Sequence, residues 1–230
     1  MYIFLVTIFP CALFLFFRQR KSAGFLSVCY AGLMCAVVFC CASGLFGNSY
    51  RLPPAGFVGN FFFYFCFETL LPIGILYAAF WLLSKDTVSF KYASFFPLIA
   101  GFYTVFLPFR VFSANATYPF FVLFVKPVLY LLLSVNAAFL LRRAYDGFGK
   151  SLKNGLPFIG ALIAALCVPA AIEAFWYDSG NTLLWILFSV LYAAAAVVNM
   201  SFPLGRERGS RCRTATGQSS ADITAESSAE

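Results

Sequence analysis

Seven long apolar runs constrain the fold of this chain more than any other feature of its sequence. About 20 apolar residues are enough, at 1.5 Å per residue of helix, to cross the ~30 Å hydrocarbon core of a bilayer. The runs cover residues 2–17, 23–46, 57–83, 93–109, 120–141, 158–177 and 183–202. The first and fourth are short, but Arg18 and Arg110 stand at their ends and can reach toward the headgroups. The pattern predicts an all-α, polytopic membrane protein with seven transmembrane helices.

Composition supports a membrane protein and excludes several kinds of chemistry. Hydrophobic residues make up 62% of the chain and charged residues 11%, against roughly 25% charged in soluble domains. The sequence contains no histidine, which removes the commonest general base and metal ligand. Seven of the eight cysteines lie in apolar runs, and no CxxC pair occurs. We therefore expect no catalytic residues, no metal site and no cofactor, and we do not expect an enzyme.

Two domains of different character are predicted. Residues 1–204 form the seven-helix transmembrane domain, in which short connections make sequential helices antiparallel neighbours. From residue 205 the composition changes to Ser, Thr, Ala, Glu and Arg, which cannot bury enough apolar surface to offset the entropy of ordering. Residues 205–230 are therefore predicted to be a disordered cytoplasmic tail.

The distribution of basic residues predicts the orientation. With the N-terminus outside, thirteen of the sixteen Lys and Arg residues lie in cytoplasmic connections or in the tail. This bias follows the positive-inside rule and predicts a cytoplasmic C-terminus in a plasma membrane or bacterial inner membrane. It also explains the net charge of +7 without a nucleic-acid partner.

Three ionisable residues lie inside the apolar runs and are the candidate site. A charge at the centre of a membrane helix costs ~2.5–3.5 kcal/mol on insertion scales, so such residues are functional candidates by default. Glu68 falls near the middle of the third run, whereas Lys126 and Glu173 lie a few residues below the outer ends of the fifth and sixth. These depths favour pairing of Lys126 with Glu173, and allow Lys126 to reach Glu68.

The functional hypothesis is a polar cavity that opens to the outer face, with Glu68, Lys126, Glu173 and Asn199 binding a substrate. Asn60 and Asn136 would add further polar groups. Broken helices beside such sites recur in transporters, and Pro72, Pro127 and Pro169 lie near the three charges. The alternative is structural, with Lys126 and Glu173 as a buried pair and Glu68 protonated.

Two functions from different classes follow from these residues. One is a small solute carrier or permease subunit, whose partners are the lipid bilayer and a small-molecule solute. The other is a non-transporting scaffold or assembly subunit that binds a membrane protein partner. Small residues at four-residue spacing, such as Gly160 and Ala164, predict close packing of the sixth and seventh helices.

The order of the runs is similar in topology to small sugar carriers built from three helices, a linker helix and three more. In that arrangement residues 93–109 are the linker, and Pro10 and Pro127 each occupy the first helix of a triplet. The similarity is one of topology alone, because the second run lacks a proline and the sequence shows no internal repeat.

Overall fold

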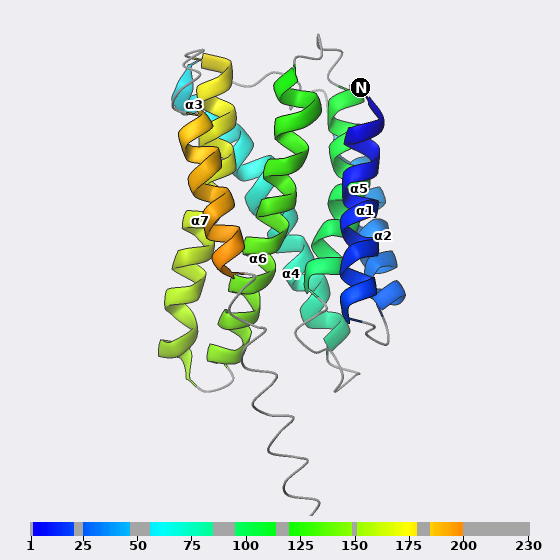
Figure 1. Cartoon of the computed structure of the whole chain (residues 1–230). Helices are drawn as coiled ribbons and strands as arrows, with labels where there is room; N and C mark the ends of the chain where they lie inside the picture. The colour runs from blue at the N-terminus through cyan, green and yellow to red at the C-terminus, as the bar shows by residue number, and fades with distance from the viewer. Residues whose placement is uncertain are drawn as a thin grey trace, which may run out of the picture.

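The computed structural model describes residues 2–20, 25–46, 56–84, 95–113, 120–148, 151–178 and 185–199, all of which are helical except Gly56 and Ser151. Three of the elements, α3, η1 and α4, follow one another without a break, as do η3 and α6. The described residues therefore form seven helical rods (Figure 1). The elements are α1 (Tyr2–Arg20), α2 (Phe25–Phe46), α3 (Phe57–Phe63), η1 (Tyr64–Leu70), α4 (Leu71–Ser84), α5 (Phe95–Ser113), η3 (Phe121–Val125), α6 (Lys126–Phe148), α7 (Leu152–Asp178) and the helix Trp185–Asn199.

Five of these rods are long and apolar enough to cross a membrane. They are Phe25–Leu45, Phe57–Phe80, Phe95–Phe112, Phe121–Tyr145 and Leu152–Asp178. The rods Tyr2–Arg18 and Trp185–Asn199 are apolar but shorter. The predicted all-helical fold is therefore confirmed and the five long apolar rods fit a multi-pass membrane protein, while seven crossings and the orientation stay predictions. The predicted tail, residues 205–230, lies outside the described residues.

The hairpin between α6 and α7 extends beyond the apolar runs that predicted it. The runs end at residue 141 and begin again at residue 158, whereas α6 continues to Phe148 and α7 starts at Leu152. The guanidinium of Arg143 lies 5.0 Å from the ring of Phe139 and 6.0 Å from that of Phe158. These cation–π contacts let a charged residue continue the helix and join it to its neighbour.

The fourth rod, α5, is a central helix. It packs against α1, α2, α4 and α6, and 67% of the residues in its apolar stretch are buried. Its contact with α2 is close because Gly32 has no side chain, and a Cβ added there would overlap the carbonyl oxygen of Leu98. A Cβ at Gly101 would lie 2.8 Å from the carbonyl oxygen of Cys29. The interpretation of residues 93–109 as a linker between two triplets stays a prediction, and α5 contacts helices on both sides of it in the chain.

On the other side of the bundle α7 packs against α6, α3 and η1, while the α3–η1–α4 rod crosses the bundle and contacts α2 and α5 through α4 (Figure 1). The predicted packing through small residues is wrong, because Gly160, Ala161 and Ala164 are exposed on α7. Aromatic side chains join α7 to the helix Trp185–Asn199 instead. The ring centroids of Trp176 and Trp185 lie 5.9 Å apart, and those of Phe175 and Phe188 lie 6.1 Å apart.

Candidate functional site

Two of the candidate charges lie where a π-helical segment meets a proline. Glu68 is part of η1, three residues before α4 begins with Leu71 and Pro72. Proline has no N–H, and its ring clashes with the carbonyl four residues back, which here belongs to Glu68. The widened π-helical turn accommodates this clash, and the Tyr103 hydroxyl donates to the freed Glu68 carbonyl at 3.0 Å. Single π-helical turns of this kind often occur at functional sites.

The same arrangement recurs at Lys126. The π-helical segment η3 ends at Val125, and α6 begins with Lys126 and Pro127. The carbonyl that Pro127 leaves without an α-helical partner is that of Leu123, inside η3. Glu68 and Lys126 therefore both lie close to a point where their rod changes from π-helix to α-helix.

Lys126 joins the two glutamates. Its Nζ donates to Glu68 Oε2 at 2.6 Å and to Glu173 Oε2 at 2.9 Å. The three residues come from three rods, since Glu68 belongs to η1, Lys126 to α6 and Glu173 to α7. The depths estimated from the sequence correctly place Lys126 within reach of both acids.

Arg110 is a fourth member that the sequence analysis left at the membrane surface. Its Nε and Nη2 donate to Glu68 Oε1 at 3.2 and 3.1 Å, which gives a forked contact from α5. Tyr130 of α6 donates to Glu68 Oε2 at 2.9 Å. We call Glu68, Arg110, Lys126 and Glu173 the charge network.

Burial makes the charge network sensitive to the loss of any member. Glu68, Lys126 and Glu173 are 2%, 5% and 0% exposed, while the Arg110 side chain is 26% exposed. Two acids and two bases leave no net charge when all four are ionised. Removing one partner from a buried ion pair leaves an uncompensated charge, which costs far more than the pair contributes. The described arrangement is therefore closed and electrically balanced.

Tyrosines surround the network at helical spacing. The residue four positions away from each of Glu68, Lys126 and Glu173 is a tyrosine: Tyr64, Tyr130 and Tyr177. Positions four apart share a face of a helix. Lys126 Nζ lies 5.3 Å from the centroid of the Tyr64 ring and 5.5 Å from that of Tyr130.

A spacing of two helical turns could have identified Arg110 from the sequence. Arg110 is seven residues after Tyr103, so the two side chains lie on one face of α5 two turns apart. The shared face of Tyr103 and Arg110 is the signal in the sequence that places Arg110 in the network.

The three asparagines lie apart from the charge network contacts. Asn199 Nδ2 donates to Asn136 Oδ1 at 2.6 Å, which ties the helix Trp185–Asn199 to α6. Asn60 is buried in α3. The structure therefore brings together Glu68, Lys126 and Glu173 but places Asn199 in a separate interhelical bond. A substrate-binding role for any of these four residues stays a prediction.

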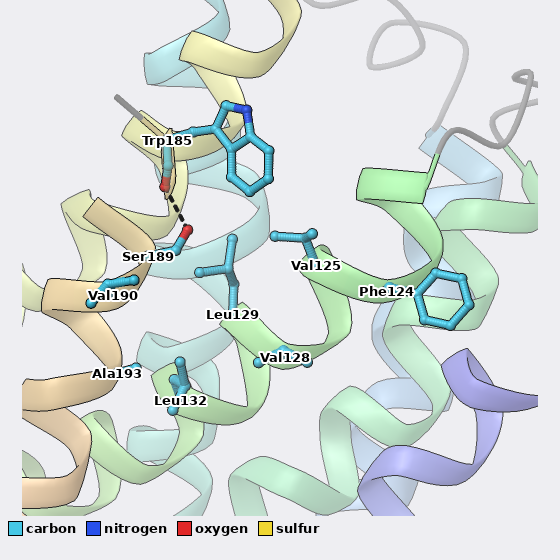
Figure 2. A pocket seen from close by; sticks show the side chains of 9 residues that line it. All are labelled: Phe124, Val125, Val128, Leu129, Leu132, Trp185, Ser189, Val190 and Ala193. Atoms are coloured by element: carbon cyan, nitrogen blue, oxygen red, sulfur yellow. Dashed lines mark hydrogen bonds between the residues drawn. The ribbon is translucent and has the colours of Figure 1, made fainter. Parts of the chain in front are cut away.

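An apolar groove of about 310 Å³ lies between α6 and the helix Trp185–Asn199 (Figure 2). Its walls carry aliphatic and aromatic side chains, and the Ser189 hydroxyl is turned toward its own helix, donating to the Trp185 carbonyl at 2.7 Å. The lining contains none of the charge network residues. It consists of Phe124, Val125, Val128, Leu129, Leu132, Trp185, Ser189, Val190 and Ala193.

No protein-family model, curated protein or solved structure matches this chain. The charge network itself is therefore the observation from which function must be argued. Carboxylates held by movable ammonium and guanidinium groups can exchange partners and protons, and they can bind a polar solute if the helices separate.

Proposed function

We propose that this protein is a small solute carrier or permease subunit whose intramembrane site is the charge network. The observation that carries the proposal is the position of Lys126, whose ammonium contacts Glu68 and Glu173 on two other rods. Glu68 lies within the π-helical segment η1, and Lys126 directly follows the π-helical segment η3. Discontinuous helices beside buried charges are the usual way in which a carrier builds a binding site near the middle of a membrane. The closed network corresponds to an occluded state, and access to it requires these rods to part.

Orientation is part of this proposal. The N-terminus faces outside and the C-terminus faces the cytoplasm, in a plasma membrane or bacterial inner membrane, since thirteen of the sixteen basic residues then lie on the cytoplasmic side. A membrane-impermeant maleimide added to intact cells should fail to label Cys212 and should label it after permeabilisation. The label that is lost in a Cys212→Ser variant is the label on Cys212. Labelling of Cys212 in intact cells would overturn the orientation.

Transport by the purified full chain tests the proposed function directly. Proteoliposomes are offered a panel of radiolabelled sugars, amino acids, nucleosides and organic anions. Wild type should take up at least one class, and Lys126→Met should reduce that uptake at least tenfold. Lys153→Met is the matched control, because Lys153 is exposed near the start of α7. If no class is taken up, or if Lys126→Met retains full uptake, the proposal is wrong.

Misfolding of Lys126→Met would not decide between these outcomes, so a second variant is needed. Lys126→Met combined with Glu173→Gln removes one base and one acid and restores the charge balance. This double variant should fold and still fail to transport. Retained transport in the folded double variant would exclude the charge network as the site.

The alternative function is a non-transporting scaffold, and two surfaces favour it. The apolar groove beside α6 and the exposed face of Gly160, Ala161 and Ala164 both offer places for another membrane helix to approach. A scaffold should co-purify with a stoichiometric partner in mild detergent and should keep that partner in the charge-balanced double variant. A carrier should lose activity in the same variant.

A further inference from the structure

The two carboxylates of the charge network differ in how completely they are satisfied. Both oxygens of Glu68 accept hydrogen bonds, Oε1 two from Arg110 and Oε2 one each from Lys126 and Tyr130. Glu173 accepts one bond, from Lys126 to Oε2. Its Oε1 is buried and has no hydrogen-bond partner among the described residues.

This difference determines which acid can bind a proton at low cost. An ionised carboxylate has about four acceptor sites, and burying one without donors is unfavourable. A proton on Glu68 would weaken bonds from two charged donors, Arg110 and Lys126, and from Tyr130. A proton on Glu173 Oε1 would displace no hydrogen bond among the described residues and would neutralise the acid that has fewer donors.

We propose that Glu173 binds and releases one proton in each transport cycle, while Glu68 stays ionised as the fixed counter-ion of Arg110. This inference rests on the proposed carrier function and names its coupling ion. In the uptake step a hydrated proton forms an O–H bond at Glu173 Oε1 and its carrier water leaves. In the release step that O–H bond breaks to water on the opposite side.

All neighbouring elements contribute to the surroundings of Glu173. The elements packed on α7 are α6, η1, α3 and the helix Trp185–Asn199, with α5 behind them. No titratable side chain occurs in α3, whose sequence is FVGNFFF. Tyr177 lies on α7 itself. The titratable and charged groups that the other elements turn toward this region are Lys126, Tyr130, Glu68, Tyr64, Tyr192, Tyr103 and Arg110.

Protonation would change the contacts that hold α7 against the rest of the site. The Lys126–Glu173 contact would become an ion–neutral contact, while Lys126 keeps its 2.6 Å bond to Glu68. The network would gain one positive charge, which is unfavourable in a closed apolar environment. Both effects favour separation of α7 from α6 and η1, and hence opening of the network.

Two tyrosines lie between the charge network and the C-terminal end of α7. Tyr177 lies one turn beyond Glu173 and is 50% exposed. Its ring stacks on that of buried Tyr64, with centroids 5.6 Å apart, and Tyr64 in turn contacts Lys126. This stack therefore lies between the exposed end of α7 and the charge network.

Infrared spectroscopy of the full chain in lipid nanodiscs tests the inference without requiring transport. The wild-type spectrum recorded during a pH titration should show the carbonyl stretch of one buried carboxylic acid appearing as the pH falls. Glu173→Gln should remove this band. Asp178→Asn is the matched control, because Asp178 is an exposed acid at the end of the same helix, and the band should persist. A band that survives in Glu173→Gln, or no such band in wild type, overturns the inference.

Proteoliposomes containing a pH-sensitive dye separate the inference from the proposed function. Solute uptake should be accompanied by proton movement in wild type, and Glu173→Gln should reduce proton movement at least tenfold. Solute uptake that is unaffected by a pH gradient would overturn proton coupling while leaving the carrier in place. A titrating Glu173 in a protein that moves no solute would overturn the carrier function, and the coupling with it.

Discussion

The α2–α5 contact and the charge network show two different ways of holding membrane helices together. At the α2–α5 contact, Gly32 and Gly101 let the two backbones approach so closely that neither position has room for a methyl group. At the charge network, long side chains from α5, η1, α6 and α7 meet. Two of the rods carry a π-helical segment there, η1 in one and η3 in the other. The first contact depends on shape, which is not easily changed, whereas the second depends on charge, which a proton or a solute can alter.

Removing Lys126 should have the largest effect on stability and would show that the charge network depends on charge. Lys126→Met leaves two buried carboxylates with only Arg110 to balance them. We expect a loss of about 3–5 kcal/mol in the free energy of unfolding. Denaturant titration in lipid bicelles measures this, and Lys153→Met should be neutral. A Lys126→Met protein as stable as wild type would mean that the network contributes nothing to the fold.

Adding a methyl group to the α2–α5 contact should have the next largest effect. Gly32→Ala places a Cβ against the Leu98 carbonyl, and backbone cannot move aside as a flexible side chain can. We expect a loss of about 3 kcal/mol, the upper part of the range for overpacking. Gly44→Ala is the control on the same helix, because its Cβ would meet no atom within 4 Å. Equal stability of the two variants would argue against a close approach of α2 and α5.

Loss of the Tyr103 hydroxyl should have a smaller effect at the break in the third rod. Tyr103→Phe leaves the Glu68 carbonyl, already freed by Pro72, without its donor. An unsatisfied buried acceptor costs about 1–3 kcal/mol. The lipid-exposed Tyr30→Phe is the control. Hydrogen exchange of amides in η1 and α4 should quicken in Tyr103→Phe alone, and unchanged exchange would exclude a role for this bond in holding the break.

The smallest effect is expected at the interhelical bond outside both regions. Asn199→Ala removes the contact with Asn136, and such bonds contribute about 0.6 kcal/mol on average in membrane proteins. Val198→Ala, on the exposed side of the same helix, controls for truncation. Transport by a folded Asn199→Ala protein should equal that of wild type, and a large loss of transport would return Asn199 to the substrate site.

The sequence predicted the helices and the central acid–base pairing well, because both depend on distances along the chain. Apolar length located the rods, and counting residues from their ends placed Glu68, Lys126 and Glu173 at compatible depths. Their mutual contacts then required only that the three rods be neighbours. The π-helical segments were not predicted, because proline indicates a break but does not determine how the backbone accommodates it.

The errors concern which helix faces which. Arg110 was assigned to the membrane surface because depth alone was considered, whereas the face that it shares with Tyr103 turns it toward Glu68. Polarity alone groups Asn199 with the charges, whereas the structure shows it bonded to Asn136 on α6, and its substrate-binding role stays a prediction. The central position of α5 depends on Gly32 and Gly101, whose partners are distant in the sequence and leave no periodic signal.

A double-mutant cycle on Lys126→Met and Glu173→Gln, measured by unfolding in bicelles, tests most directly whether these two residues form a buried pair. It should be run at a pH where the infrared band of the protonated acid is absent. We expect the double variant to be more stable than the sum of the two single losses predicts, by about 1–3 kcal/mol. Strictly additive losses would mean that Lys126 and Glu173 do not interact, and the charge network would not exist as described.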